Sequence, residues 1–230
     1  MRVLAAGSLK RVWPVLMAHF PQPADTLFGP AGLLRECIEA GEPCDLFASA
    51  NRAHPETLLH RGRALSVIPF ASNMLCLTVR SDVLHPGDDW HTLLTRGDLR
   101  IATSTPGADP SGDYTQRLFT QMGDAGEAVR QRAMALVGGR DTPPVPHGRL
   151  AAEWLILEGK ADLFIGYSSY RTALGQIAGL RVIDIPVVFN PQAEYVCAVI
   201  TPQAEPLAAF LASPLAQSVL PVLRDAGFGC

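Results

Sequence analysis

Short apolar runs alternate with amphipathic helical patterns along most of the chain, and this alternation limits the folds that the chain can adopt. Runs with the length and bounding turn residues of buried strands lie at residues 3–6, 44–50, 73–79, 99–104, 161–167, 181–185 and 194–200. Helical spacing of apolar residues falls between them, at residues 9–20, 33–41, 113–122, 148–159 and 205–227. The alternation predicts an α/β protein with largely parallel sheets, and two proline-rich segments, 138–149 and 184–194, are predicted loops or crossings between domains.

The first helical pattern carries its apolar residues on one face, at Leu9, Val12, Trp13, Leu16, Met17 and Phe20. Pro14 lies on the other face and lacks a backbone N–H, so we expect either a local bend or a helix that begins late. The second pattern places on its apolar side Leu33, Leu34, Cys37 and Ile38, and Gly41 is its predicted stop.

The charge pattern argues against nucleic acid as a partner. The formal net charge is -3 at pH 7, and no run of Lys and Arg is longer than a pair, so the basic patch that phosphate backbones require is missing from the sequence. No apolar stretch reaches the roughly 20 residues of a membrane-spanning helix. These features predict a soluble protein.

The cysteines show no spacing typical of a metal or redox site. Cys37, Cys44, Cys76, Cys197 and Cys230 form no Cys-x-x-Cys pair and have no histidine pair at zinc spacing nearby. Most are expected to be buried as small apolar side chains. Cys37 and Cys44 could form a disulfide in an oxidising compartment, and the spacing leaves this open.

Four segments run into a helical pattern through a small-residue junction: "AAGSLKR", "FGPAGLLRE", "DPSGDYTQRLF" and "PHGRLAAEWL". Each helix start carries about half a positive charge and up to four N–H groups without an intrahelical acceptor. Taken singly, each junction is explained by a plain helix cap, with Ser8 as a typical N-cap residue. Together, the four could form an anion site with little formal charge, in which Ser8 offers its hydroxyl and N–H to an oxyanion.

Catalytic motifs are missing from the sequence. It contains no G-x-S-x-G, no G-x-x-x-x-G-K-[ST], no G-x-G-x-x-G and no H-E-x-x-H. His147 is the one histidine beside a candidate junction, and the others are expected at the surface: His19, His54, His60, His85 and His91. Asp109 and Asp113 flank a helix start and are expected to complement its dipole. A hydrolase using Ser111, His147 and Asp109 is a remaining hypothesis, but no enzyme is predicted.

In the same segments the sequence resembles the molybdate-binding proteins of ABC transporters, which have the type II periplasmic binding protein fold. The resemblance runs from "VLAAGSL" through "FGPAGLLRECIEAGEPCDLFASAN", "NMLCLTV", "IATSTPGADPSGDY" and "LEGKADLFIGYSS" to "AEYVCAVI" and the final "AGFG". It implies two lobes, residues 1–78 plus 192–230 and residues 79–191, each with a mostly parallel sheet flanked by helices. The lobes would be joined by crossing strands, at 73–79 and 194–200, with the ligand cleft between them.

The resemblance also implies a set of binding residues. Ser8 matches the first binding serine, and Tyr167 in "IGYSS" matches the binding tyrosine. Ala31 stands where the family has a second serine, so only its backbone N–H would remain. Ser111 stands where the family often has alanine, which would add a hydroxyl.

Two further positions bear on the nature of the ligand. Arg149 stands where the family usually has an apolar residue that donates its N–H. If the guanidinium of Arg149 faced the ligand, it would add a positive charge and a bidentate pair of donors. The alternative is a solvated arginine at a helix start. "ADPSG" is similar to the "DPCG" of archaeal tungstate and molybdate binders, which makes Asp109 a candidate direct ligand of the oxyanion's metal.

The expected function is capture of molybdate or tungstate by a monomeric periplasmic protein that delivers it to a membrane permease. No cofactor is implied beyond the bound oxyanion. Neutral donors favour fully deprotonated oxyanions, because a ligand proton would meet no acceptor. Sulfate or a small carboxylate remains an alternative ligand. The sequence begins without a recognisable signal peptide, so a cytosolic oxyanion sensor or carrier of the same fold remains a second hypothesis.

Overall fold

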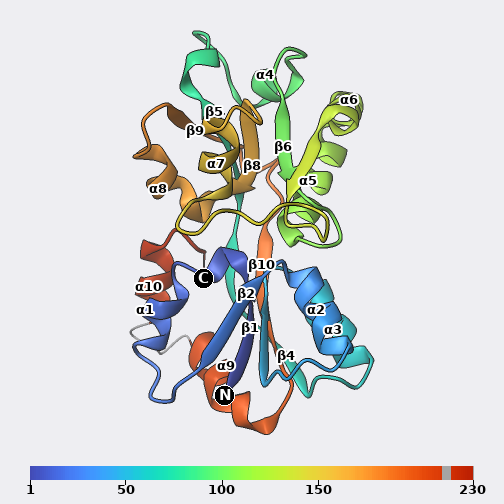
Figure 1. The fold of residues 1–230 in the computed structure, drawn as a ribbon, viewed down its shortest axis with the longest axis vertical. Coiled ribbons are helices and arrows are strands. Elements are labelled where there is room, and N and C mark those ends of the chain that lie inside the picture. Colours follow the sequence, from blue (N-terminus) through green and yellow to red (C-terminus); the bar gives the residue numbers. More distant parts are fainter. Residues whose placement is uncertain (214–218, 230) are drawn as a thin grey trace. The chain divides into compact units, whose positions relative to one another are not determined.

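The computed structural model describes residues 1–213 and 219–229. The chain divides into two compact units, one made of Met1–Asn73 with Ala193–Cys230 and the other of Met74–Gln192. Each unit contains a five-stranded sheet flanked by helices (Figure 1). Within the described ranges, no helix has both the length and the hydropathy needed to cross a bilayer.

The first unit is built on a sheet with strand order β2-β1-β3-β10-β4. Its strands are β1 (Arg2–Ala6), β2 (Asp25–Gly29), β3 (Leu46–Ser49), β4 (Ser66–Asn73) and β10 (Ala193–Val199). Strand β10 runs antiparallel to both of its neighbours, and the other four strands share one direction. Its helices are η1 (Gly7–Leu9), α1 (Trp13–Met17), α2 (Ala31–Glu39), α3 (Ala53–His60), η4 (Pro202–Ala204), α9 (Glu205–Ala212) and α10 (Val219–Asp225). Helices α2 and α3 pack together on one flank, and α1 and α10 on the other (Figure 1).

The second unit repeats this plan with strand order β7-β6-β8-β5-β9. Its strands are β5 (Leu75–Arg80), β6 (Ile101–Ser104), β7 (Met134–Val137), β8 (Leu163–Tyr167) and β9 (Leu180–Asp184). Here β5 is the one strand that runs against the others. Its helices are η2 (Ser81–Val83), α4 (Trp90–Thr95), α5 (Pro110–Gln121), α6 (Asp124–Arg132), α7 (Ala151–Leu157), η3 (Ser168–Tyr170) and α8 (Arg171–Gly175). The predicted α/β class is confirmed, with sheets that are mixed by one reversed strand each.

The reversed strand of each sheet directly follows a passage of the chain from one unit to the other. The chain enters the second unit at Met74, one residue before β5, and re-enters the first at Ala193, where β10 begins. The sequence placed these boundaries after residues 78 and 191. Residues 75–78 belong to the second unit because β5 pairs with β8 and β9 along its length. The run 73–79 spans the first passage, as predicted, since Asn73 ends β4 and residues 75–79 lie in β5. The run 194–200 follows the second passage and lies within the first unit.

Local predictions at the first two helices can be compared with the structure. Helix α1 begins late, at Trp13, with Pro14 in its first turn, where a missing N–H costs no hydrogen bond. The apolar face is buried as predicted, apart from the half-buried Met17. Two predictions were wrong: Cys37 is exposed on α2, and His54 is buried on α3, where its backbone N–H donates to the Asn51 side chain.

The cysteines within the described ranges are free thiols. Cys37 is exposed and Cys44 is buried, so the disulfide that the sequence left open is not formed in this structure. Burial raises the pKa of the Cys44, Cys76 and Cys197 thiols to about 12, which leaves them protonated and unreactive at neutral pH.

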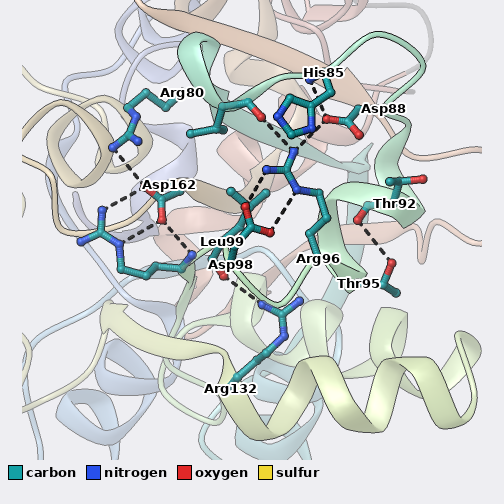
Figure 2. Close-up of polar contacts among 12 residues, drawn as sticks. Arg80, His85, Asp88, Thr92, Thr95, Arg96, Asp98, Leu99, Arg132 and Asp162 are labelled. Carbon is teal, nitrogen blue, oxygen red and sulfur yellow. Dashed lines mark hydrogen bonds and ion pairs between the residues drawn. The ribbon is translucent and has the colours of Figure 1, made fainter.

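A cluster of ion pairs fixes the loops that lead into β6 and β8 in the second unit (Figure 2). The buried carboxylate of Asp162 accepts from Arg100 Nε and Nη2 at 2.9 Å each, and from Arg80 Nη1 at 3.0 Å. Arg96 pairs with Asp88 at 3.0 Å and with Asp98 at 2.7 Å. The Asp162 pairs join segments far apart in the sequence, whereas Arg96 pairs with residues near it in the chain, and both sets are structural in character.

Candidate functional site

Ser8 and Ala31 lie at the same edge of the first sheet. Strands β1 and β2 are parallel, and their last residues, Ala6 and Gly29, are register partners. Ser8 follows Ala6 by two residues and Ala31 follows Gly29 by two. The two junctions are in close approach here, since a Cβ added to Gly7 would lie 3.8 Å from the Gly29 carbonyl oxygen. The carboxyl ends of parallel strands are where ligands bind in open α/β sheets.

Ser8 is not a helix cap. It lies inside the short turn η1, whose cap residue is Ala6, and no side-chain cap is present there. Its Oγ instead accepts a hydrogen bond of 2.8 Å from Tyr195 Oη, on β10. A serine hydroxyl has one proton to donate and two lone pairs. The Tyr195 contact uses a lone pair, so the Ser8 proton remains for another acceptor.

The start of α2 presents backbone donors. Its N-cap is Pro30, which gives no side-chain hydrogen bond, and the first intrahelical bond runs from Leu34 N to Pro30 O at 3.0 Å. The N–H groups of Ala31, Gly32 and Leu33 therefore have no intrahelical acceptor. Ala31 and Gly32 are buried. Ala31 thus has an N–H without an intrahelical acceptor, with a partial positive charge from the helix behind it.

Asn51 is a further polar residue at this edge, and the sequence reasoning did not single it out. It follows β3, the other parallel neighbour of β1, and is buried. Its Oδ1 accepts from His54 N at 3.1 Å and from Ser49 Oγ at 3.2 Å, which leaves the Nδ2 end of the amide as the donor. The signal was present, because Asn51 follows a buried strand as Ser8 does.

In the second unit, the start of α5 holds a buried serine hydroxyl. Ser111 is 4% exposed, and its Oγ has no hydrogen-bond partner within residues 1–213 and 219–229. Its backbone N–H donates to Asp109 Oδ1 at 3.1 Å. The hydroxyl, not the N–H, is therefore the group that Ser111 can offer to a ligand. A buried hydroxyl without a partner costs about 1 to 3 kcal/mol, which a ligand acceptor would recover.

Asp109 acts as the N-cap of α5. Its side chain accepts from the Ser111 N–H, and its backbone oxygen accepts from Gly112 N at 2.9 Å. Burial raises the pKa of the Asp109 carboxyl to about 6, although the Ser111 N–H opposes this shift. Within the described part of the chain, no group of three or more His, Cys, Asp or Glu is arranged to hold a metal ion. The capping role accounts for Asp109.

Tyr167 lies at the same edge of the second sheet as the start of α5. It is the last residue of β8, is 5% exposed, and is the register partner of Leu75. Strand β8 is parallel to β6, whose chain continues into α5, so both strands end at one edge. The structure thus brings Ser8 and Ala31 together in one unit, and Ser111 and Tyr167 to one sheet edge in the other.

Arg149 does not have a free guanidinium. Its Nε donates to Glu153 at 3.1 Å and its Nη1 to Glu158 at 2.8 Å, both from the region of α7. These carboxylates raise the pKa of Arg149, Glu158 most strongly. Two carboxylates around one guanidinium leave a net negative charge, which disfavours an anion there. The prediction that Arg149 adds a charged fork to the site is therefore not supported, and the alternative of an arginine at a helix start describes it.

The hydrolase hypothesis lacks its geometry. His147 is exposed on the loop before α7, and Ser111 Oγ has no base within hydrogen-bond distance among the described residues. Nucleophilic catalysis by serine requires such a contact.

The sequence and the fold match known proteins over the whole chain. A family model described as bacterial extracellular solute-binding protein matches residues 2–229. An uncharacterised protein of Pasteurella multocida is 43% identical over 238 residues, covering 99% of this chain and 98% of its own length.

Two solved structures show the same fold. One is the periplasmic molybdate-binding protein of Azotobacter vinelandii, with a TM-score of 0.74, 21% identity, and coverage of 100% of this chain and 99% of its own. The other is the sulfate-binding protein SubI of Mycobacterium tuberculosis, with a TM-score of 0.75, 18% identity, and coverage of 99% and 85%. The fold is that of the two-lobed periplasmic binding proteins.

Proposed function

The chain belongs to the bacterial extracellular solute-binding protein family, and on this premise we propose that it captures a tetrahedral oxyanion, molybdate or tungstate in the first place. Proteins of this family bind substrates and are not enzymes, and we propose no catalysis. The observation that carries the proposal is the start of α2, where buried N–H groups without intrahelical acceptors lie beside the Ser8 hydroxyl.

Each unit has its own set of neutral donors that suits a dianion. The first unit supplies the N–H groups of Ala31 and Gly32 and the hydroxyl of Ser8. The second supplies the buried hydroxyls of Ser111 and Tyr167. We propose that the donor set of each unit can contact a bound oxyanion. All of these donors are neutral, and a helix N-terminus provides the favourable field.

A neutral donor set selects for the protonation state of its ligand. Fully deprotonated oxyanions accept from every donor, whereas a ligand that keeps a proton leaves that proton and one protein donor unmatched, at a cost of about 1 to 3 kcal/mol. Hydrogen phosphate is disfavoured on this ground. Molybdate, tungstate and sulfate carry equal charge, and their sizes distinguish them. The structural likeness to a sulfate-binding protein makes sulfate the second candidate ligand.

The remaining elements of the proposal follow from the family. We propose that the protein works as a monomer outside the cytoplasmic membrane and hands its ligand to the membrane permease of an ABC transporter. A cytosolic sensor or carrier of the same fold is the alternative, and no described feature favours it.

A thermal-shift series tests the proposal. The ligand-free protein is heated with molybdate, tungstate, sulfate, phosphate or a small carboxylate, each over a range of concentrations. A ligand at 100 times its dissociation constant adds about 2.7 kcal/mol of stability. Stabilisation by molybdate and tungstate, reduced in Ser8→Ala, supports the proposal. Stabilisation by sulfate alone shifts it to the second candidate, and stabilisation by a carboxylate alone contradicts it.

A further inference from the structure

Three buried or half-buried polar groups form a chain of hydrogen bonds in the first unit. Asn73 Nδ2 donates to Tyr195 Oη at 3.4 Å, and Tyr195 Oη donates to Ser8 Oγ at 2.8 Å. Asn73 is 2% exposed and Tyr195 is fully buried. We call these three residues the Ser8 relay.

The relay has a direction. An amide nitrogen can only donate, so Asn73 Nδ2 occupies a lone pair of Tyr195 Oη. The tyrosine proton is then directed to Ser8 Oγ, as the 2.8 Å contact shows. Ser8 cannot donate back along this bond, and its own proton must point to a different acceptor.

The relay also ends where the chain passes between the units. Asn73 is the last residue of β4, directly before the chain leaves the first unit, and Tyr195 is the third residue of β10, directly after it returns. Asn73 and Ala193 are register partners in this part of the sheet. The orientation of Ser8 is therefore linked to the two strand ends that pair at this passage.

The tyrosine ring is held independently of its hydroxyl. Phe70 and Phe228 both meet it edge to face, with ring centroids 6.2 Å and 5.2 Å from that of Tyr195. Such contacts fix the plane of an aromatic ring. Removing the hydroxyl alone should leave the ring in place.

We propose that Tyr195 is a positioning residue for ligand selectivity: its proton occupies one lone pair of Ser8 Oγ and so orients the Ser8 hydroxyl with its proton toward the ligand, which favours a fully deprotonated oxyanion over a protonated one. This inference rests on the proposed function. Without the tyrosine proton, Ser8 Oγ can turn and accept from a ligand O–H. Tyr195 then acts on selectivity through Ser8, without touching the ligand.

The test compares wild type with Tyr195→Phe by titration calorimetry. Each protein is titrated with molybdate, tungstate and sulfate, and with phosphate by competition at neutral pH. The readout is the ratio of the phosphate dissociation constant to that of the best-bound deprotonated oxyanion. One hydrogen bond to a charged group corresponds to a change of about tenfold or more, so the ratio should fall by about tenfold in Tyr195→Phe. A purely structural role for the hydroxyl would weaken all ligands equally.

Thr201→Val is the matched control. Thr201 Oγ1 donates to Asp45 Oδ1 at 2.6 Å in the same unit, so this variant also loses a hydrogen-bonded hydroxyl, and its ratio should not change. An unchanged ratio in folded Tyr195→Phe overturns the inference. If that variant does not fold, Asn73→Ala takes its place, with the same expected fall and the same contrary result. Failure of the wild type to bind any of these oxyanions would refute the proposed function instead.

Discussion

Replacing Ser111 by alanine should move stability and ligand affinity in opposite directions. The Ser111 hydroxyl is buried and unpartnered among the described residues, so the ligand-free protein carries the cost of its lost hydration, about 1 to 3 kcal/mol. Alanine removes this cost while the backbone N–H keeps its bond to Asp109. The ligand-free Ser111→Ala protein should therefore be more stable than wild type by about 1 kcal/mol or more. The same change deletes a donor to a dianion, and affinity should fall by about 10- to 100-fold.

Urea unfolding of the ligand-free proteins and calorimetric titration with molybdate measure the two effects. Thr115→Val is the control one turn further along α5, since Thr115 Oγ1 is buried and already donates to Ser111 O at 2.8 Å. That variant should lose stability, because the Ser111 carbonyl oxygen loses one of its hydrogen-bond donors. If Ser111→Ala is destabilised in the same way, or binds ligand as tightly as wild type, the reasoning about its hydroxyl is refuted.

Three further predictions concern charged groups. Asp109→Asn should be more stable than wild type at pH 8 by about 2 to 3 kcal/mol in urea unfolding, because the raised pKa of about 6 means that wild type loses stability as pH rises from about 4 through 6. The difference in stability should vanish below pH 4. A constant difference across this pH range would refute the prediction. Arg149→Ala should change oxyanion affinity by less than about twofold, since its guanidinium is already paired; a tenfold loss in calorimetry would return Arg149 to the site. Asp162→Asn should lower stability at pH 7 by about 1 to 3 kcal/mol, because its ion pairs, with Arg100 above all, hold the pKa of Asp162 below its usual value. This loss of stability should shrink as pH falls through the lowered pKa. Equal stability of the two proteins at pH 7 would contradict the structural role of the Arg100–Asp162 pair.

The parts of the fold that sequence patterns predicted are those with strong apolar runs. Strand β3, which is fully buried, and strand β8, which is buried apart from the half-buried Gly166, were found in this way. Strand β2 was not predicted because its residues are half-buried or exposed, so no apolar run marks it. Strand β4 contains Pro69, which argues against a central strand, and β4 is accommodated because it lies at the edge of its sheet.

The candidate site was predictable where it follows a predicted strand. Ser8 follows β1, which an apolar run marks, but β2, which precedes Ala31, was not predicted, so the pairing that brings Ser8 and Ala31 together came from the structure. The role of Tyr195 could not be predicted from the sequence, because its hydrogen bond to Ser8 joins residues 187 positions apart. For Arg149 the sequence left two alternatives, a charged fork facing the ligand and an arginine at a helix start. The structure pairs Arg149 with Glu153, four residues on, at a spacing typical of helical ion pairs.

The most direct test of the central claim is a calorimetric titration of the ligand-free protein with molybdate, with phosphate and a small carboxylate titrated in parallel at neutral pH. A site of neutral donors predicts one molybdate per chain, bound at least about tenfold more tightly than phosphate. Phosphate or the carboxylate binding more tightly than molybdate would contradict the account.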